Sequence, residues 1–156
     1  MRNFQLLLMF LTFLSCDLDS KIELDGTWII TEMTYNGENV YPKTLNQKVR
    51  IVYSGYENSE SIIFKISDST ITLPGFESDQ IKMKFTSDQQ KLEIYLNDSN
   101  SESESKLTSK IFSGIYDLTY SNGENKLKLN SDKTYINMIS QKEIISQAVD
   151  KVFDGI

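Results

Sequence analysis

The chain has 156 residues, 39% of them hydrophobic, with 22 acidic and 16 basic side chains and a net charge of −6. This length fits one domain, and the acidic balance argues against nucleic acid as a partner and against electrostatic docking on anionic lipid. The sequence contains no histidine, which excludes the usual catalytic triads, the histidine general base and most zinc sites. We expect no metal and no cofactor.

The N-terminal segment predicts a secretory signal. Arg2 precedes an apolar run from Phe4 to Leu14, which matches a signal h-region and is shorter than the ~20 residues of a spanning helix. The run ends in the stretch FLSC, in which Ser15 precedes Cys16, the only cysteine of the chain. A chain with a single cysteine cannot form an intrachain disulfide.

The FLSC stretch resembles the lipobox of bacterial lipoproteins. The resemblance implies that residues 1–15 are removed and that Cys16 is acylated, so that the protein is anchored to a membrane of the cell envelope, with the outer membrane as the expected site. Residues 16–23 would form a polar tether to a domain over residues 24–156. Removal of the signal would leave a net charge of −7, because Arg2 is lost with it. The alternative is an ordinary buried cysteine after an unrelated apolar start.

Alternation of apolar and polar residues predicts about nine short strands and no helix between them. The clearest is QIKMKFTS at residues 80–87, and Asn-Gly pairs at 36–37 and 122–123 indicate tight turns, because Asn-Gly suits the positive φ that such turns need. One apolar face per strand favours an antiparallel sheet, either closed on itself or folded as a sandwich. The other predicted strands lie at residues 24–33, 47–55, 60–67, 69–73, 91–97, 110–120, 125–131 and 133–139.

The C-terminal stretch switches to helical spacing and predicts one amphipathic helix at residues 140–154. Ser140 and Glu143 have the spacing of a capping box, and Gly155 would end the helix. Because the polar face mixes both signs of charge, we expect the apolar stripe to pack on the sheet rather than on a membrane. The stripe comprises Ile144, Ile145, Ala148, Val149, Val152 and Phe153.

Gly26, Thr27 and Trp28 open the first predicted strand, and this tryptophan is the only one in the chain. In an all-β chain followed by one helix, the triplet resembles the G-x-W motif of the lipocalins, and the lipobox-like start is similar to that of lipocalin-like lipoproteins of the Bacteroidota type. The resemblance implies an antiparallel up-and-down barrel of eight to nine strands with a C-terminal amphipathic helix, in which Trp28 closes one end. The alternative is a plain core aromatic in another β fold.

Lipocalins usually stack an arginine from the end of the last strand on this tryptophan. The only arginines here are Arg2 and Arg50, so Lys133 is the candidate substitute.

The resemblance also implies a function, the holding of a small hydrophobic ligand in the barrel, with an open mouth opposite Trp28. Glu32 shares the pleat face of Trp28 and Ile30, so its carboxylate would point inward unless a bulge intervenes; an inward carboxylate must be paired, hydrated or bound to ligand. The candidate ligand-lining residues are Glu32, Ile51, Ile62, Phe64, Met83, Ile94, Tyr116 and Leu118.

Two other classes of function stay open. One is an envelope interaction or inhibitor protein whose barrel is filled with side chains and whose loops contact another protein. The other is an enzyme with a carboxylate pair, for which Glu32 and Asp117 are the candidates, although neither has a partner at an informative spacing. The acidic stretch at residues 97–105 lacks the glycine of a calcium loop. We therefore expect a non-enzymatic, lipid-anchored barrel.

Overall fold

The structure is a computed structural model, and it describes residues 22–41, 60–75, 80–88, 90–96, 106–121 and 123–153. Within these residues, nine strands form a single antiparallel sheet. The strands are β1 (Gly26–Tyr35), β2 (Glu38–Asn39), β3 (Ser61–Lys65), β4 (Thr70–Pro74), β5 (Gln80–Ser87), β6 (Lys91–Tyr95), β7 (Gly114–Ser121), β8 (Lys126–Asn130) and β9 (Thr134–Ser140). The helices are η2 (Ile66–Asp68), α2 (Lys106–Phe112) and α3 (Gln141–Phe153).

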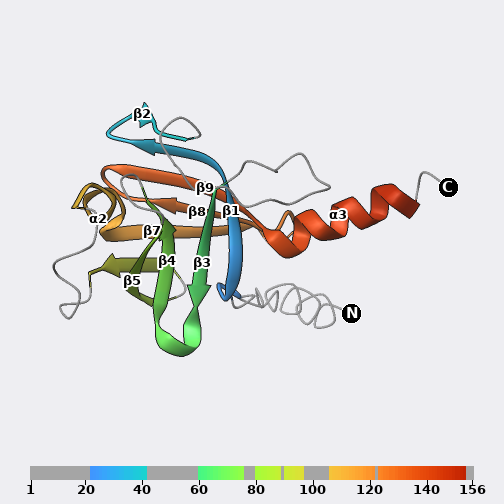
Figure 1. The fold of residues 1–156 in the computed structure, drawn as a ribbon, viewed down its shortest axis with the longest axis horizontal. Coiled ribbons are helices and arrows are strands. Elements are labelled where there is room, and N and C mark those ends of the chain that lie inside the picture. The colour runs from blue at the N-terminus through green and yellow to red at the C-terminus, as the bar shows by residue number, and fades with distance from the viewer. Residues whose placement is uncertain are drawn as a thin grey trace, which may run out of the picture.

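The sheet closes on itself. Its strand order is β2-β1-β3-β4-β5-β6-β7-β8-β9, and an additional β1–β9 pairing joins the two sides (Figure 1). That pairing sets Trp28 opposite Ser140 at one end of β1 and Tyr35 opposite Thr134 at the other. Eight strands therefore form an up-and-down barrel, and the two-residue β2 pairs with the C-terminal end of β1, on the edge that pairs with β3 at the other end. The predicted barrel of eight to nine strands with a C-terminal helix is confirmed, and the sandwich is not found.

The strands form where alternation sends every second side chain into the barrel. In β5, Ile81, Met83 and Phe85 are buried, whereas Lys82 and Thr86 are exposed, and the strand has the predicted bounds. The inward side chains of all eight barrel strands merge into one buried cluster. The strand predicted at residues 47–55 lies outside the described residues.

A bulge in β1 reverses the expected side for Glu32. Ile30 pairs with Met138 and Glu32 with Asn137, so β1 advances two residues while β9 advances one, and Thr31 is the extra residue. After the bulge Met33 points inward with no exposed area, and Glu32 is exposed. The prediction that Glu32 lines the interior is therefore wrong, because strict alternation stops at Thr31.

A helix precedes β7 where a continuous strand was predicted at residues 110–120. Helix α2 covers Lys106–Phe112, and its Thr108, Ile111 and Phe112 are buried, which is the spacing of one helical face rather than of a strand. Gly114 then has φ +149, a value that side-chain-bearing residues rarely adopt, and β7 starts there. The expectation of no helix between the strands is wrong at this point.

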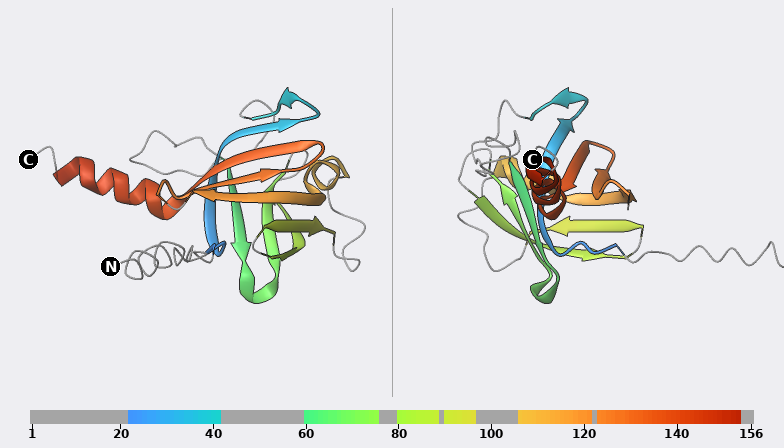
Figure 2. Two further views of the ribbon diagram at one scale, coloured as in Figure 1. Left: turned by 180° about the vertical axis from the view of Figure 1, so that it is seen from behind. Right: turned by 90° about the vertical axis from the view of Figure 1, so that its right-hand side faces the viewer.

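Helix α3 projects from the end of the barrel opposite α2 (Figures 1 and 2). Ile144 is 1% exposed and packs with Ile29 and Ile139 on the outside of the sheet, but Ile145 is 50% and Val149 46% exposed. The helix exists as predicted, and only its first turn packs on the sheet as the prediction required. The expected packing of the whole stripe on the sheet is wrong for Ile145 and Val149.

Candidate functional site

Trp28 lies at the α3 end of the barrel. Its side chain is 3% exposed, and its indole N–H donates a hydrogen bond to the carbonyl of Leu24 at 2.9 Å. Gly26, with φ +119, lets the chain turn between these two residues, because a side chain at this φ would be strained. The Tyr120 ring meets the indole edge to face, with centroids 6.1 Å apart. Gly26 and Trp28 thus lie at this end of the barrel, and the Tyr120 ring is beside the tryptophan.

Lys133, the candidate to stack on Trp28, lies at the opposite end of β1. Its carbonyl accepts the backbone N–H of Asn36 at 2.8 Å, and the adjacent Thr134 pairs with Tyr35. The expected Lys133 contact is therefore wrong. The sequence has one signal for Tyr120: it continues the alternation of Tyr116 and Leu118, which places its ring on the inner face of β7.

A chain of hydrogen bonds connects Tyr120 to α3. The Tyr120 hydroxyl donates to Asn125 Oδ1 at 2.8 Å, and Asn125 Nδ2 donates to Glu143 Oε2 at 2.6 Å. Gln147 Nε2 donates to the other Glu143 oxygen. The bond from Gln147, and to a smaller degree the bond from Asn125, holds the pKa of the Glu143 carboxyl below its usual value. The Ser140 N–H, which a capping box would give to Glu143, donates to the Asn125 carbonyl instead. The predicted capping box is thus replaced by a link between the β7–β8 turn and the helix.

A surface cavity of about 590 Å³ lies between this end of the barrel and the start of α3. Its lining mixes carboxylates and amides with apolar surface from Trp28, Tyr120 and Ile145. The Lys142 ammonium lies 3.8 Å from the Glu23 carboxylate, which brings the first turn of α3 beside the residues that precede β1. Side chains that line the cavity include Glu23, Asp25, Trp28, Tyr120, Asn125 and Ile145.

The end of the barrel opposite Trp28 is covered by α2. The Tyr116 hydroxyl donates to the Phe112 carbonyl at 2.9 Å, and Thr134 Oγ1 donates to the Ile111 carbonyl at 2.7 Å. Ile111 and Phe112 are 3% and 0% exposed and belong to the barrel core. Burial raises the pKa of Tyr116 to about 12. The expected open mouth at this end is therefore wrong, since helix α2 covers it.

Six of the predicted ligand-lining residues come together inside the barrel. They pack in one core with exposed fractions from 0% to 8%, and Phe64 meets Phe85 edge to face at 5.3 Å. A void that admits water would leave accessible area on the side chains that border it, so these six contact other side chains rather than a solvent-sized space. They are Ile62, Phe64, Met83, Ile94, Tyr116 and Leu118.

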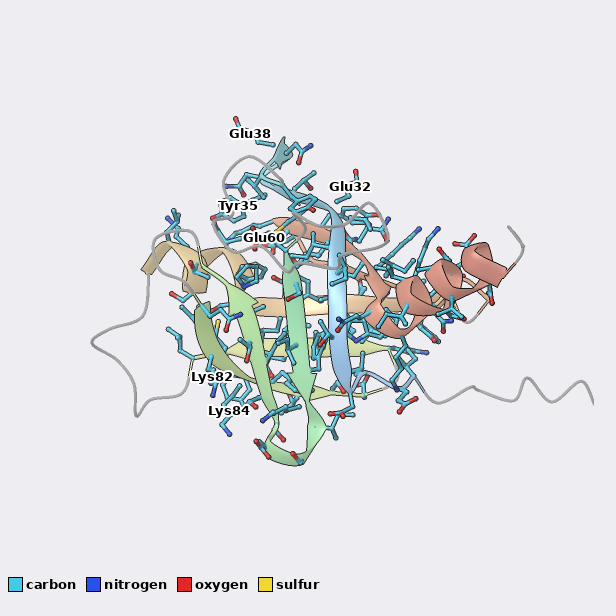
Figure 3. All side chains as sticks on the ribbon, turned by 45° about the vertical axis from the view of Figure 1, so that its right-hand side comes forward. Glu32, Tyr35, Glu38, Glu60, Lys82 and Lys84 are labelled. Atoms are coloured by element: carbon cyan, nitrogen blue, oxygen red, sulfur yellow. The ribbon has the colours of Figure 1, made fainter. Side chains whose placement is uncertain are left out.

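The other predicted site residues lie elsewhere. Ile51 and Cys16 fall outside the described residues. Glu32 is on the outer face of β1 (Figure 3), and Asp117 is on the outer face of β7, where its carboxylate is 4.0 Å from the Lys91 ammonium. Since β1 and β7 are not neighbours in the sheet, the carboxylate pair considered for catalysis is not brought together.

No group of three or more metal-ligating side chains occurs in the part of the chain that the structure describes. Among the same residues, no helix combines the length and the apolarity needed to cross a membrane.

Comparisons with known proteins identify no family. No protein-family model matches the sequence, and no curated protein matches it. Among solved structures, the fold is similar to that of an uncharacterized protein from Bacteroides eggerthii, with 12% sequence identity and a TM-score of 0.45 over 76% of this chain and 99% of that chain.

Proposed function

We propose that the chain is a lipid-anchored protein of the cell envelope, held at the outer membrane, whose side-chain-filled barrel acts by contact with another protein. The observation that carries this proposal is the packing of the interior: the inward residues of the described strands have almost no accessible area. Trp28 covers one end and α2 the other. A rigid, filled barrel has its outer face and its loops left for recognition.

The anchor rests on the lipobox-like FLSC stretch and its single cysteine. Acylation of Cys16 would supply membrane attachment to a domain whose acidic balance gives it no electrostatic attraction to anionic lipid. A lipocalin-like relationship is part of the proposal. It is supported by Trp28 at a closed barrel end and a helix after the last strand, although Tyr120 takes the place beside the tryptophan where lipocalins use a cation.

We propose a non-enzymatic role. The two carboxylates with the best claim to chemistry, Glu32 and Asp117, are exposed on separate outer faces of the barrel. A pair that shares a substrate needs its carboxyl groups within about 10 Å across one cleft. Neither group lines the cavity beside α3 or a second surface cavity, which Thr86, Lys91 and Glu93 border.

A small hydrophobic ligand inside the barrel is the second candidate function, and the apolar character of the interior favours it. Phe112 would have to leave the core for a ligand to enter, which makes α2 the gate in this alternative. Its polar attachments include the bonds from Tyr116 and Thr134 to the carbonyls of Phe112 and Ile111. Burial alone would then supply roughly 25 cal/mol per Å² of apolar ligand area.

Titration with a fluorescent fatty-acid analogue separates the two functions. The filled barrel predicts no saturable binding by the wild-type protein and weak binding by Phe112→Ala, which opens space at the core. Leu107→Ala, on the exposed side of the same helix, is the matched control and should not bind. Saturable one-to-one binding by the wild type would replace the filled-barrel proposal with the ligand-binding one.

The anchor is tested by metabolic labelling with a palmitate analogue. Label is expected on the wild type and not on Cys16→Ala, which should stay unprocessed or leave the membrane fraction. Label that persists on Cys16→Ala would overturn the lipoprotein proposal.

A further inference from the structure

Helix α3 leaves the barrel with apolar side chains that its packing on the sheet leaves about half exposed. Ile144 is buried against Ile29 and Ile139, but Ile145 and Val149, one helical turn apart, are each about half exposed. Beyond its first turn the helix points away from the barrel (Figure 2). Apolar side chains at this spacing on a projecting helix are typical of a contact with something outside the domain.

The chain length before β1 places the proposed anchor close to this helix. Five residues separate Cys16 from Ile22, and an extended chain over these six Cα-to-Cα steps spans at most about 22 Å. The segment after Ile22 lies against the start of α3, as the 3.8 Å contact of Glu23 with Lys142 shows. With 13 residues, α3 is itself about 20 Å long. An acyl chain on Cys16 would therefore hold the Trp28 end of the barrel, and α3 with it, within about one helix length of the bilayer.

We propose that α3 lies on the membrane surface and places Ile145 and Val149 in the lipid interface, as a second contact beside the acyl anchor. This inference rests on the proposed acylation of Cys16. The exposed polar residues of the helix carry both signs, with Lys142 and Asp150 among them, so the contact relies on apolar burial and does not need anionic lipid. The tether makes a weak contact effective, because it raises the local concentration of helix at the surface.

The contact orients the barrel. Because α3 points away from the barrel on the side opposite α2, a helix that lies flat on the bilayer sets the barrel beside it, with the α2 end and Lys133 of the β8–β9 turn farthest from the helix (Figure 1). The surface that a protein partner reaches is then the α2 end and the barrel wall.

A fluorophore on Val149 tests the inference in the full, acylated chain. Acylation occupies the thiol of Cys16, so Val149→Cys supplies the only free thiol for labelling. The labelled protein is reconstituted in phosphatidylcholine vesicles, with and without a nitroxide-bearing phosphatidylcholine as the lipid-phase quencher, and is titrated with iodide as the aqueous quencher. Asp150→Cys, one residue along on the polar side of the helix, is the matched control, and Lys133→Cys reports the far end.

We expect the nitroxide lipid to quench the Val149 probe about threefold more than the Asp150 probe, and iodide to quench it less by a similar factor, because the apolar face of an interfacial helix sits at the headgroup boundary. The Lys133 probe should respond to iodide alone. Replacing a third of the lipid with phosphatidylglycerol should leave the pattern unchanged.

Three results would overturn the inference, and they are distinguishable. Equal iodide quenching at Val149 and Asp150 in vesicle-bound protein would mean that the helix stands off the lipid while the anchor holds. Protection of the Val149 probe from both quenchers would mean that protein, such as a second copy, covers the face. A measured mass without an acyl group would show that the chain has no lipid anchor, and the inference would then fail before any quenching is measured.

Discussion

Trp28 and Tyr120 contact each other edge to face although their strands, β1 and β7, are not hydrogen-bonded neighbours. The pair therefore ties opposite parts of the barrel wall together at one end. We expect Trp28→Ala to lower the free energy of unfolding by roughly 3–5 kcal/mol, because it leaves a cavity at a nine-tenths buried site. Tyr120→Phe keeps the ring and loses the bond to Asn125, so its cost should be about 1 kcal/mol. Urea unfolding followed by circular dichroism measures both, and equal costs would contradict this division of roles.

The bulge at Thr31 predicts opposite outcomes for two adjacent substitutions. Met33 has no exposed area, so Met33→Ala should cost about 2–5 kcal/mol. Glu32 is on the outer face, and Glu32→Ala should change the free energy of unfolding by no more than about 0.5 kcal/mol. Urea midpoints of the two variants provide the comparison. A large cost at Glu32 with a small one at Met33 would mean that the strand runs without its bulge.

Ile144 and Ile145 form a second matched pair. Ile144→Asp buries an uncompensated charge against Ile29 and Ile139, and the expected loss is about 3 kcal/mol or more. Ile145→Asp adds a charge at a half-exposed position and should cost about 0.5 kcal/mol or less in the protein free of lipid. Thermal melts in detergent-free buffer distinguish them. Equal melting temperatures would show that the first turn of α3 is not held against the sheet.

Tyr116 makes stability fall at alkaline pH. Its pKa is raised to about 12, chiefly by burial, whereas an unfolded tyrosine ionises near 10. The neutral form is favoured by folding, so this contribution is fully present below pH 10 and is lost as the pH rises from 10 to 12, at about 1 kcal/mol per pH unit. Tyr116→Phe removes the hydroxyl that donates to Phe112. It should be about 1 kcal/mol less stable at pH 8, and its stability should decline less steeply above pH 10. Parallel decline of the two proteins in urea titrations would refute the assignment.

The barrel strands could be predicted because each must bury one face. In β5 the alternation of Ile81, Met83 and Phe85 with polar residues has no helical interpretation, and its bounds matched. The bulge at Thr31 interrupts this alternation in β1, and the sequence contains a signal of the interruption. Met33 follows Ile30 by three positions, so the next apolar residue is out of phase with a regular strand. An interpretation from alternation alone put Glu32 inside.

Helix α2 was missed for a different reason. Ile111 fits an alternating strand pattern as well as a helical one, and seven residues are too few for periodicity to decide. The spacing of Thr108, Ile111 and Phe112, followed by Gly114, was the available signal. The resemblance to lipocalins implied an open mouth, and the strand pattern supplied no element to cover it, so the main error about the site came from one short element.

For α3, periodicity located the helix and left its surroundings undetermined. An apolar stripe indicates that something covers it, and the sequence does not say whether that is the sheet or a surface outside the domain. Ile144 and Ile145 are adjacent and chemically identical, yet one is buried and the other is not. The difference depends on where Ile29 and Ile139 lie in the closed barrel.

The closure of β1 on β9 determines when the chain can fold. The Thr31 hydroxyl donates a hydrogen bond to the carbonyl of Asn137, 106 residues further on, so the barrel assembles from contacts that are distant in sequence. Such topologies fold slowly, and strand edges stay open while they do. A chain that emerges N-terminus first carries β1 with one edge unpaired until β9 appears. A chain stopped before Thr134 keeps the facing edges of β1 and β8 open and is expected to aggregate rather than fold.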